Sequence, residues 1–333
     1  MEKRRYEKQC SRDELHLQIL YFNFTVRAHK KVIRICDDAT LLNEVGGILA
    51  QAGEKSLTQK ALRRSITLLP EKGFEKYLTL AQFCTGSESL KFITKGVELL
   101  RTEAPEDTRR LSEAYCNVAE LYMTDLCQEK NAQSSCECAV KAALEADRTN
   151  AGAYIVATSF LISSSKFDEA KKMLLDGKSL WYEKYEDLIY EKVEVPVESK
   201  IDSEKRMNAC RYAIELEMWD DAIQIARQVS EEEVEDCETR YFLAYGLFRR
   251  WKEMVEDTNF TNEEEINDYK RDCFEEANET LRLAEAAVKQ REAGAKDILN
   301  ETKQMLDDLG PPPPEEEDAM NEEDWETDDE MNE

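Results

Sequence analysis

The fold is decided by the stretch AGAYIVATSFLISSSKFDEAKKMLLDGKSL, residues 151–180. Its apolar and small residues recur every three or four residues in each half, which is the spacing of one face of a helix. The polar run between the halves predicts a turn, so the stretch predicts two amphipathic helices joined as a hairpin. With Ala151 as position 1, positions 4, 7, 8, 11, 17, 20, 24, 27 and 30 are Tyr154, Ala157, Thr158, Leu161, Phe167, Ala170, Leu174, Gly177 and Leu180.

The same pattern recurs along the chain at about 34 residues, the period of a two-helix repeat. The residues that anchor the other five copies are Leu42, Tyr77, Tyr115, Trp219 and Tyr241. This pattern resembles the tetratricopeptide repeat, a hairpin of helix A and helix B. A single hairpin cannot bury its apolar face alone, so the copies must stack. We therefore expect an all-α fold, a tetratricopeptide-repeat solenoid of about six helical hairpins with a disordered acidic C-terminal tail.

The composition of the two ends differs from that of the repeats. Residues 1–36 match no repeat and are predominantly basic, so we expect an N-terminal extension that is either a cap or a flexible arm. Residues 37–306 are the expected solenoid. Residues 307–333 contain Pro311–Pro314, followed by 12 acidic residues and no basic residue in the last 19. This composition predicts a stiff proline-rich spacer and a disordered tail.

Three irregular segments are expected within the solenoid. Residues 124–133 exceed the repeat period and predict an insertion in the third hairpin. The acidic residues 253–268 predict an insertion between the two helices of the sixth hairpin. Residues 183–199, which include Pro196, predict a connection between the fourth and fifth copies.

The net charge narrows the class of partner. The chain carries 45 basic and 72 acidic residues, a net charge of −27. Such a chain repels phosphate groups and anionic lipid, so we expect no direct binding of nucleic acid and no association with a membrane. An acidic protein attracts basic ones. The predicted partner is therefore a cationic protein.

Few residues suit catalysis or metal binding. The only histidines are His16 and His29, and both precede the repeats. Histidine is the commonest general acid and base, so its absence from the repeats argues against an enzyme. Cys10 and Cys36 could join the two histidines in a four-ligand site, but the spacing fits no zinc motif. We expect no catalytic residue, no metal and no cofactor.

The ten cysteines contain no Cys-x-x-Cys pair. We expect reduced thiols, buried where they fall at helix-packing positions, which is typical of a protein of the cytoplasm and nucleus. Cys136 and Cys138 lie two residues apart in a predicted helix, so we expect them on different faces of it.

What remains is a binding surface. In tetratricopeptide arrays, positions 2, 5, 9, 12 and 13 of helix A form the concave face. The partner-binding residues that the resemblance implies on this face are Asn43, Glu75, Gln82, Glu113, Glu120 and Met123. Amides and carboxylates there suit an extended peptide that carries Lys or Arg. In the tail, we expect additional contacts from Glu315, Glu316, Glu317 and Asp318.

One run of sequence narrows the resemblance. The segment SEAYCNVAELYMTDLC, residues 112–127, resembles the eukaryotic family of assembly chaperones dedicated to large-subunit ribosomal protein four. Residues 215–222, residues 241–248 and the ending from Leu309 through Trp325 match the same family, so the resemblance covers the chain from about residue 39. It implies a chaperone that binds the basic internal loop of its newly made client, and we expect the chaperone to be a monomer. It also implies that the client stays soluble until it is incorporated into pre-60S ribosomes.

Two alternatives stay open. The chain could be another tetratricopeptide adaptor or co-chaperone, or a histone chaperone that shares the acidic tail. Adaptors that grip the C-terminal carboxylate of heat-shock chaperones carry Lys at position 5 and Asn at position 9 of the first helix A. Here these positions are Asn43 and Gly47, so that clamp is missing.

Overall fold

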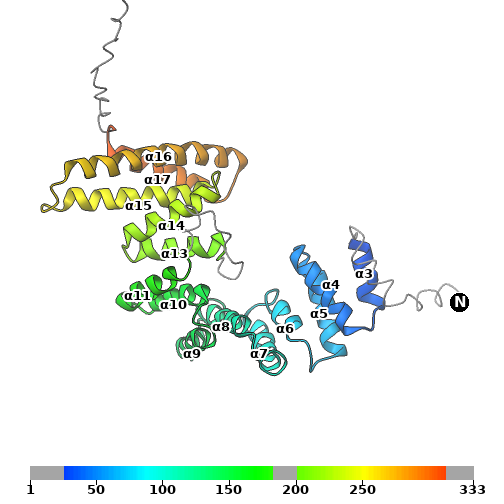
Figure 1. Cartoon of the computed structure of the whole chain (residues 1–333). Helices are drawn as coiled ribbons and strands as arrows, with labels where there is room; N and C mark the ends of the chain where they lie inside the picture. Colours follow the sequence, from blue (N-terminus) through cyan, green and yellow to red (C-terminus); the bar gives the residue numbers. More distant parts are fainter. Residues whose placement is uncertain (1–25, 183–200, 313–333) are drawn as a thin grey trace, which may run out of the picture. The chain divides into compact units, whose positions relative to one another are not determined.

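The computed structural model describes residues 26–182 and 201–312. These residues form helices and no strand (Figure 1). The chain divides into two compact units, Met1–Leu216 and Glu217–Glu333. The helices are α3 (Val26–Ile35), α4 (Ala39–Gln51), α5 (Lys55–Leu68), α6 (Phe74–Ala81), α7 (Gly86–Glu103), α8 (Thr108–Met123), α9 (Ala132–Ala146), α10 (Ala151–Ser163), α11 (Phe167–Ser179), α13 (Ser203–Glu215), α14 (Trp219–Glu232), α15 (Cys237–Glu256), α16 (Glu263–Gln290) and α17 (Ala295–Leu309).

Consecutive helices pack in pairs, as the repeat pattern predicts. In the first unit α4 packs on α5, α6 on α7, α8 on α9 and α10 on α11. In the second unit α15 packs on α16. The fifth predicted copy comprises α13 and α14, which belong to different units. The expected all-α array of helical hairpins is confirmed, with α4, α6, α8, α10, α13 and α15 as the A helices.

Most A helices begin at an Asp or Asn side chain. Asp38 Oδ1 accepts hydrogen bonds from the backbone N–H groups of Thr40 and Leu41, at 2.9 and 3.1 Å. The same role falls to Asp107, Asn150, Asp202 and Asp236. Helix α6 begins at Gly73 instead, whose N–H donates to the carboxylate of Glu103 at the end of α7, at 2.9 Å. A cap contributes about 1 kcal/mol, so these side chains fix where each helix A starts.

Small residues allow the two helices of a hairpin to approach closely. A Cβ atom placed on Gly177 of α11 would lie 2.6 Å from the Cβ atom of Tyr154 on α10. In other hairpins a small polar side chain of helix B donates to a carbonyl group of helix A. These bonds join Ser65 to Ala39, Ser89 to Ala81, Cys136 to Ala119 and Cys273 to Ala244. The sequence thus encodes the hairpin contact through side-chain size.

The bounds predicted for the insertion at 253–268 are wrong. Helix α15 continues to Glu256 and α16 begins at Glu263, so most of these residues lengthen the two helices of the sixth hairpin. The physical reason is that Glu is a good helix former. Exposed charges also pair along the helix, as Arg271 does with Asp268 at 3.0 Å, one turn away. Charge alone did not distinguish an exposed helix from a loop.

The third hairpin and the two ends of the repeats also contain residues outside the regular helix pairs. Residues 124–131 form the turns between α8 and α9, where the insertion in the third hairpin is expected. At the N-terminal side Val32, Ile33 and Cys36 are buried in one cluster with residues of α4 and α5. Helix α17 packs on α15 and α16, as a capping helix does in a solenoid. The domain boundaries at residues 36 and 306 stay predictions.

Several predicted features lie outside the described residues. They are the connection at 183–199, the first 25 residues with Cys10 and His16, and the tail residues Glu315, Glu316, Glu317 and Asp318.

The nine cysteines of the described residues are free thiols. Cys136 is buried and Cys138 is exposed, which confirms that they lie on different faces of α9. Burial raises the pKa of Cys116, Cys210 and Cys273 to about 12 in each case.

We expect iodoacetamide to alkylate the exposed Cys127 and Cys138 in the native protein and to reach Cys116, Cys210 and Cys273 only after unfolding. The reason is that alkylation needs both access and a thiolate, and burial removes both. Mass spectrometry of peptides taken during the reaction measures each rate. If Cys210 reacted as fast as Cys138, the packing of α13 would be wrong.

Candidate partner-binding site

Several A helices of the first unit pack against one another. Helix α4 packs against α6, α8 against α10, and α10 against α13. We call the side that carries Asn43, Glu75, Glu113, Glu120 and Lys205 the helix-A face. The predicted residues belong to three helices or their ends. Asn43 lies on α4, Glu75 lies at the start of α6, and Gln82 directly follows the end of α6. Glu113, Glu120 and Met123 lie on α8. The glutamates and Gln82 are exposed, whereas Asn43 and Met123 are half-buried.

Charged side chains of α8 and α13 lie close to one another on this face. Glu113 and Glu120 are seven residues apart and so lie two turns apart on the same side of α8. Lys205 of α13 lies within the field of both, and its ammonium group donates to Asp202 at 2.9 Å. Loss of hydration lowers the pKa of Lys205, but the bond to Asp202 and the surrounding carboxylates outweigh it and raise that pKa above its usual value.

The side chain of Lys205 also crosses α10. A Cβ atom on Gly152, at the start of α10, would lie 3.7 Å from Lys205 Cδ. The structure therefore brings α8, α10 and α13 together around one lysine.

The negative charge of Glu120 is only partly offset by the neighbouring cation. Its side chain is exposed, yet the protein around it removes part of the carboxylate's hydration, which raises its pKa. Lys205 lowers that pKa and Glu204 raises it, and the balance remains upward. A carboxylate in this condition is stabilised by an arriving cation.

Glu75 is in a different condition. Its carboxylate lies 3.6 Å from the guanidinium of Arg110 on α8, which also pairs with Asp107 at 3.3 Å. The same guanidinium lies 5.5 Å from the centre of the Phe74 ring. Arg110 thus offsets part of the charge of Glu75. The predicted carboxylates therefore differ: Glu75 on α6 is partly neutralised by Arg110, whereas Glu113 and Glu120 on α8 form a negatively charged group.

Position 5 of helix A does not face outward in every copy. Cys116 and Ile155 occupy it in the third and fourth copies and are only 7% and 6% exposed. Cys116 packs with Ala143 and Ala153 in the core. In the fourth copy Gly152 and Ser159 occupy positions 2 and 9, so this part of the helix-A face carries no charge from α10 at those positions.

The sequence interpretation missed Asp202, Glu204 and Lys205. One signal for Glu204 was available: with Trp219 at position 17, Ser203 is position 1 and Glu204 is position 2, which belongs to the face. The weak repeat pattern of α13 hid this register.

Among residues 26–182 and 201–312, no group of His, Cys, Asp and Glu side chains is arranged to hold a metal ion. No helix in the same ranges is long and apolar enough to cross a membrane.

Comparisons place the chain among known proteins. No family model matches it. It is 32% identical over 301 residues to the "Probable assembly chaperone of rpl4" of Schizosaccharomyces pombe, which covers 86% of this chain and 84% of that protein. The solved structure "Assembly Chaperone of RpL4 (Acl4) (Residues 1-338)" is similar with a TM-score of 0.60 and 21% identity, over 69% of this chain and 89% of that one.

A second solved structure, the Cut9 and Hcn1 hetero-tetramer of the APC/C, is similar with a TM-score of 0.53 and 11% identity. The similarity covers 89% of this chain and 47% of that one. The two structural similarities support the solenoid fold.

Proposed function

This chain belongs to the family of assembly chaperones of rpl4, and from that membership we propose that it holds the basic internal loop of newly made ribosomal protein L4 on its helix-A face. As a member of the family it is a dedicated chaperone of ribosomal protein L4.

One observation carries the proposal. Glu113, Glu120 and Glu204 gather at the junction of α8 and α13, where Lys205 is the cation that faces them. A charge-assisted hydrogen bond contributes about 1.5–3 kcal/mol, more than a neutral one. Lys or Arg side chains of an extended client segment supply the missing counter-charge.

The physical benefit to the client follows from its charge. A basic segment that normally packs against ribosomal RNA binds other polyanions when it is made before that RNA is at hand. Carboxylates on the helix-A face compete with those polyanions while the client is soluble. The acidic tail can add weak contacts at a high local concentration, because it is tethered to the same chain.

The proposal extends to the oligomeric state of the chaperone, its location in the cell and the step at which it releases its client. The chaperone acts as a monomer in the cytoplasm and nucleus and releases its client into pre-60S ribosomes. With a net charge of −27 it makes no direct contact with nucleic acid.

Titration of the full-length chain with a labelled peptide of the L4 loop tests the proposal. A peptide of equal length and equal charge from a histone tail is the matched probe. We expect tighter binding of the L4 peptide by fluorescence anisotropy. Equal or tighter binding of the histone peptide would favour the histone-chaperone alternative and reject the dedicated loop site.

Removal of residues 311–333 is expected to weaken binding of the L4 peptide a few-fold and to reduce its dependence on salt. The reason is that the tail contributes 12 carboxylates in 19 residues, whose attraction is screened by salt. Dissociation constants at about 50 mM and about 300 mM NaCl measure the slope. A chain with a Gly/Ser tail of the same length is the control, and an unaltered slope would exclude the tail from binding.

A further inference from the structure

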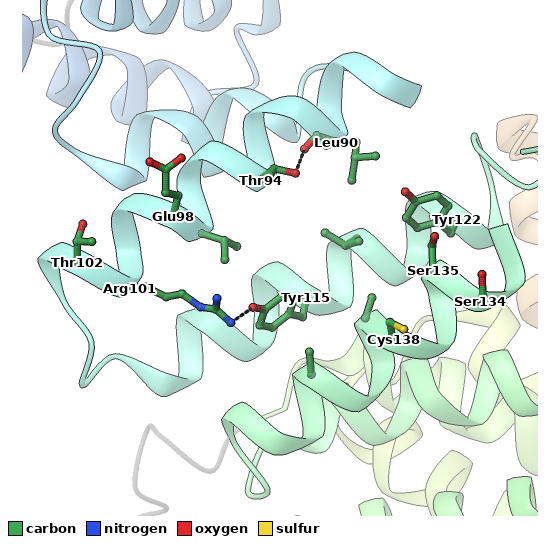
Figure 2. A pocket seen from close by; sticks show the side chains of 14 residues that line it. Leu90, Thr94, Glu98, Arg101, Thr102, Tyr115, Tyr122, Ser134, Ser135 and Cys138 are labelled. Carbon is green, nitrogen blue, oxygen red and sulfur yellow. Dashed lines mark hydrogen bonds between the residues drawn. The ribbon is translucent and has the colours of Figure 1, made fainter. Parts of the chain in front are cut away.

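A groove of about 950 Å³ lies between α7, α8 and α9 (Figure 2). Helix α8 contributes Tyr115, Val118 and Tyr122 to it. At 100° per residue these side chains lie 140–200° around α8 from Glu113, which is the opposite side from Glu113 and Glu120. The groove and the helix-A face therefore lie on opposite sides of the same helix, and one does not obstruct the other.

Most of the groove is lined by apolar or small side chains. The residues that provide it are Leu90, Val97, Val118, Ala139 and Ala142, with the rings of Tyr115 and Tyr122.

Hydroxyl groups at the rim of the groove donate hydrogen bonds to backbone carbonyls of their own helix or of the turn before it. The hydroxyl of Thr94 donates to the carbonyl of Leu90 at 2.8 Å, and that of Ser134 donates to the carbonyl of Asn131 at 3.0 Å. Figure 2 shows the first of these bonds. Because these donors are satisfied, the groove favours an occupant with apolar side chains.

One end of the groove is positive. The guanidinium of Arg101 lies 5.7 Å from the centre of the Tyr115 ring and donates to the Tyr115 hydroxyl (Figure 2). Among the described residues no carboxylate lies within ion-pair distance of Arg101. Glu98, the acidic residue of the lining, is engaged by Lys95 at 3.0 Å. The chain as a whole has a net charge of −27, but at this end of the groove Arg101 is placed to pair with a carboxylate of a bound partner.

We propose that this groove binds an amphipathic segment of a second protein, in which a row of apolar side chains adjoins a carboxylate that pairs with Arg101. The partner differs in chemistry from the basic client, and both can be bound together. The overall charge of the chain slows the approach of an acidic partner, so recognition depends on the short-range pair and the apolar contact.

The first test uses two fluorescent synthetic peptides of equal length with the same helical row of Leu and Phe, one flanked by Glu and the other by Lys. In the full chain, Arg101→Glu is expected to weaken binding of the Glu-flanked peptide about tenfold or more. Lys91→Glu makes the same change of charge on the same helix, at an exposed position outside the groove, and is expected to change affinity less than about twofold. Equal losses would reduce the effect to net charge and overturn the proposal.

The second test locates the peptide. Cys138 lines the groove, and Cys127 is exposed outside it. The bound Glu-flanked peptide is expected to slow alkylation of Cys138 and to leave the rate at Cys127 unchanged. Ser135→Trp, which fills the groove from α9, is expected to abolish this protection, whereas Gln133→Trp, at an exposed position on the same helix, is expected to preserve it.

If Cys138 stayed unprotected at saturating peptide, the groove would not be the site. This outcome is independent of the proposed function, because L4-loop binding is measured on the opposite side of α8.

Discussion

Replacing Glu75, Glu113 and Glu120 together by lysine is expected to weaken binding of the L4 loop peptide by about 100-fold or more, with helix content unchanged. Each substitution removes an attraction and adds a repulsion. The effect is largest at Glu113 and Glu120, because Lys205 would then lie among cations where it now lies among carboxylates. The cost in stability is small, since the Glu75–Arg110 pair is half exposed and such a pair is worth about 0–1 kcal/mol.

A matched variant distinguishes a site from net charge. Glu129, Glu145 and Glu169 are exposed and lie off the A helices of the same unit. Their joint replacement by lysine makes the same change of six charge units and is expected to weaken binding less than about threefold. Fluorescence anisotropy gives the two affinities, and circular dichroism confirms that both variants remain folded. Similar losses in the two triple variants would show that no particular face holds the peptide.

Gly177→Ala is expected to lower the free energy of unfolding by about 2 kcal/mol, whereas Gly47→Ala is expected to raise it by up to about 1 kcal/mol. Helix propensity alone predicts a gain for both substitutions. At Gly177, however, the new methyl group would lie 2.6 Å from Tyr154 Cβ, an atom next to the backbone that no rotamer moves away. The two helices of the fourth hairpin must then separate. At Gly47, apart from the neighbouring residues and backbone of its own helix, no atom lies within 4 Å of the new methyl group.

Urea unfolding followed by circular dichroism measures both variants against the parent chain. The opposite signs are the informative result, because the chemical change is identical. If Gly177→Ala left stability unchanged or raised it, the close approach of α10 and α11 would be wrong.

The fold was predictable because small and large residues recur at fixed positions of each repeat. The pattern of Tyr154, Ala170, Leu174 and Gly177 locates α10 and α11 and the contact between them. The acidic residues 253–268 carried no such pattern. Their helical state depends on pairs such as Arg271 with Asp268 and on the helices from which they continue, so composition alone gave the wrong answer.

The sequence predicts which side chains of the site lie together on one helix, but it does not predict which side chains of different helices meet. Glu113 and Glu120 share a face of α8 by spacing alone, so the sequence sufficed to place them together. Lys205 lies far along the chain, and only the packing of α10 against α8 and α13 brings it to them. The groove beside Arg101 was missed for a related reason: it consists of space that α7, α8 and α9 leave unfilled, and periodicity does not record the distance between helices.

The cap of α6 has a consequence for the order in which the chain folds. Asp38 precedes the helix that it caps, so α4 can start as soon as it leaves the ribosome. Glu103 follows α6 by more than a full helix and is the last residue of α7. During synthesis from the N-terminus, the second hairpin therefore gains its first cap only when its final residue has emerged.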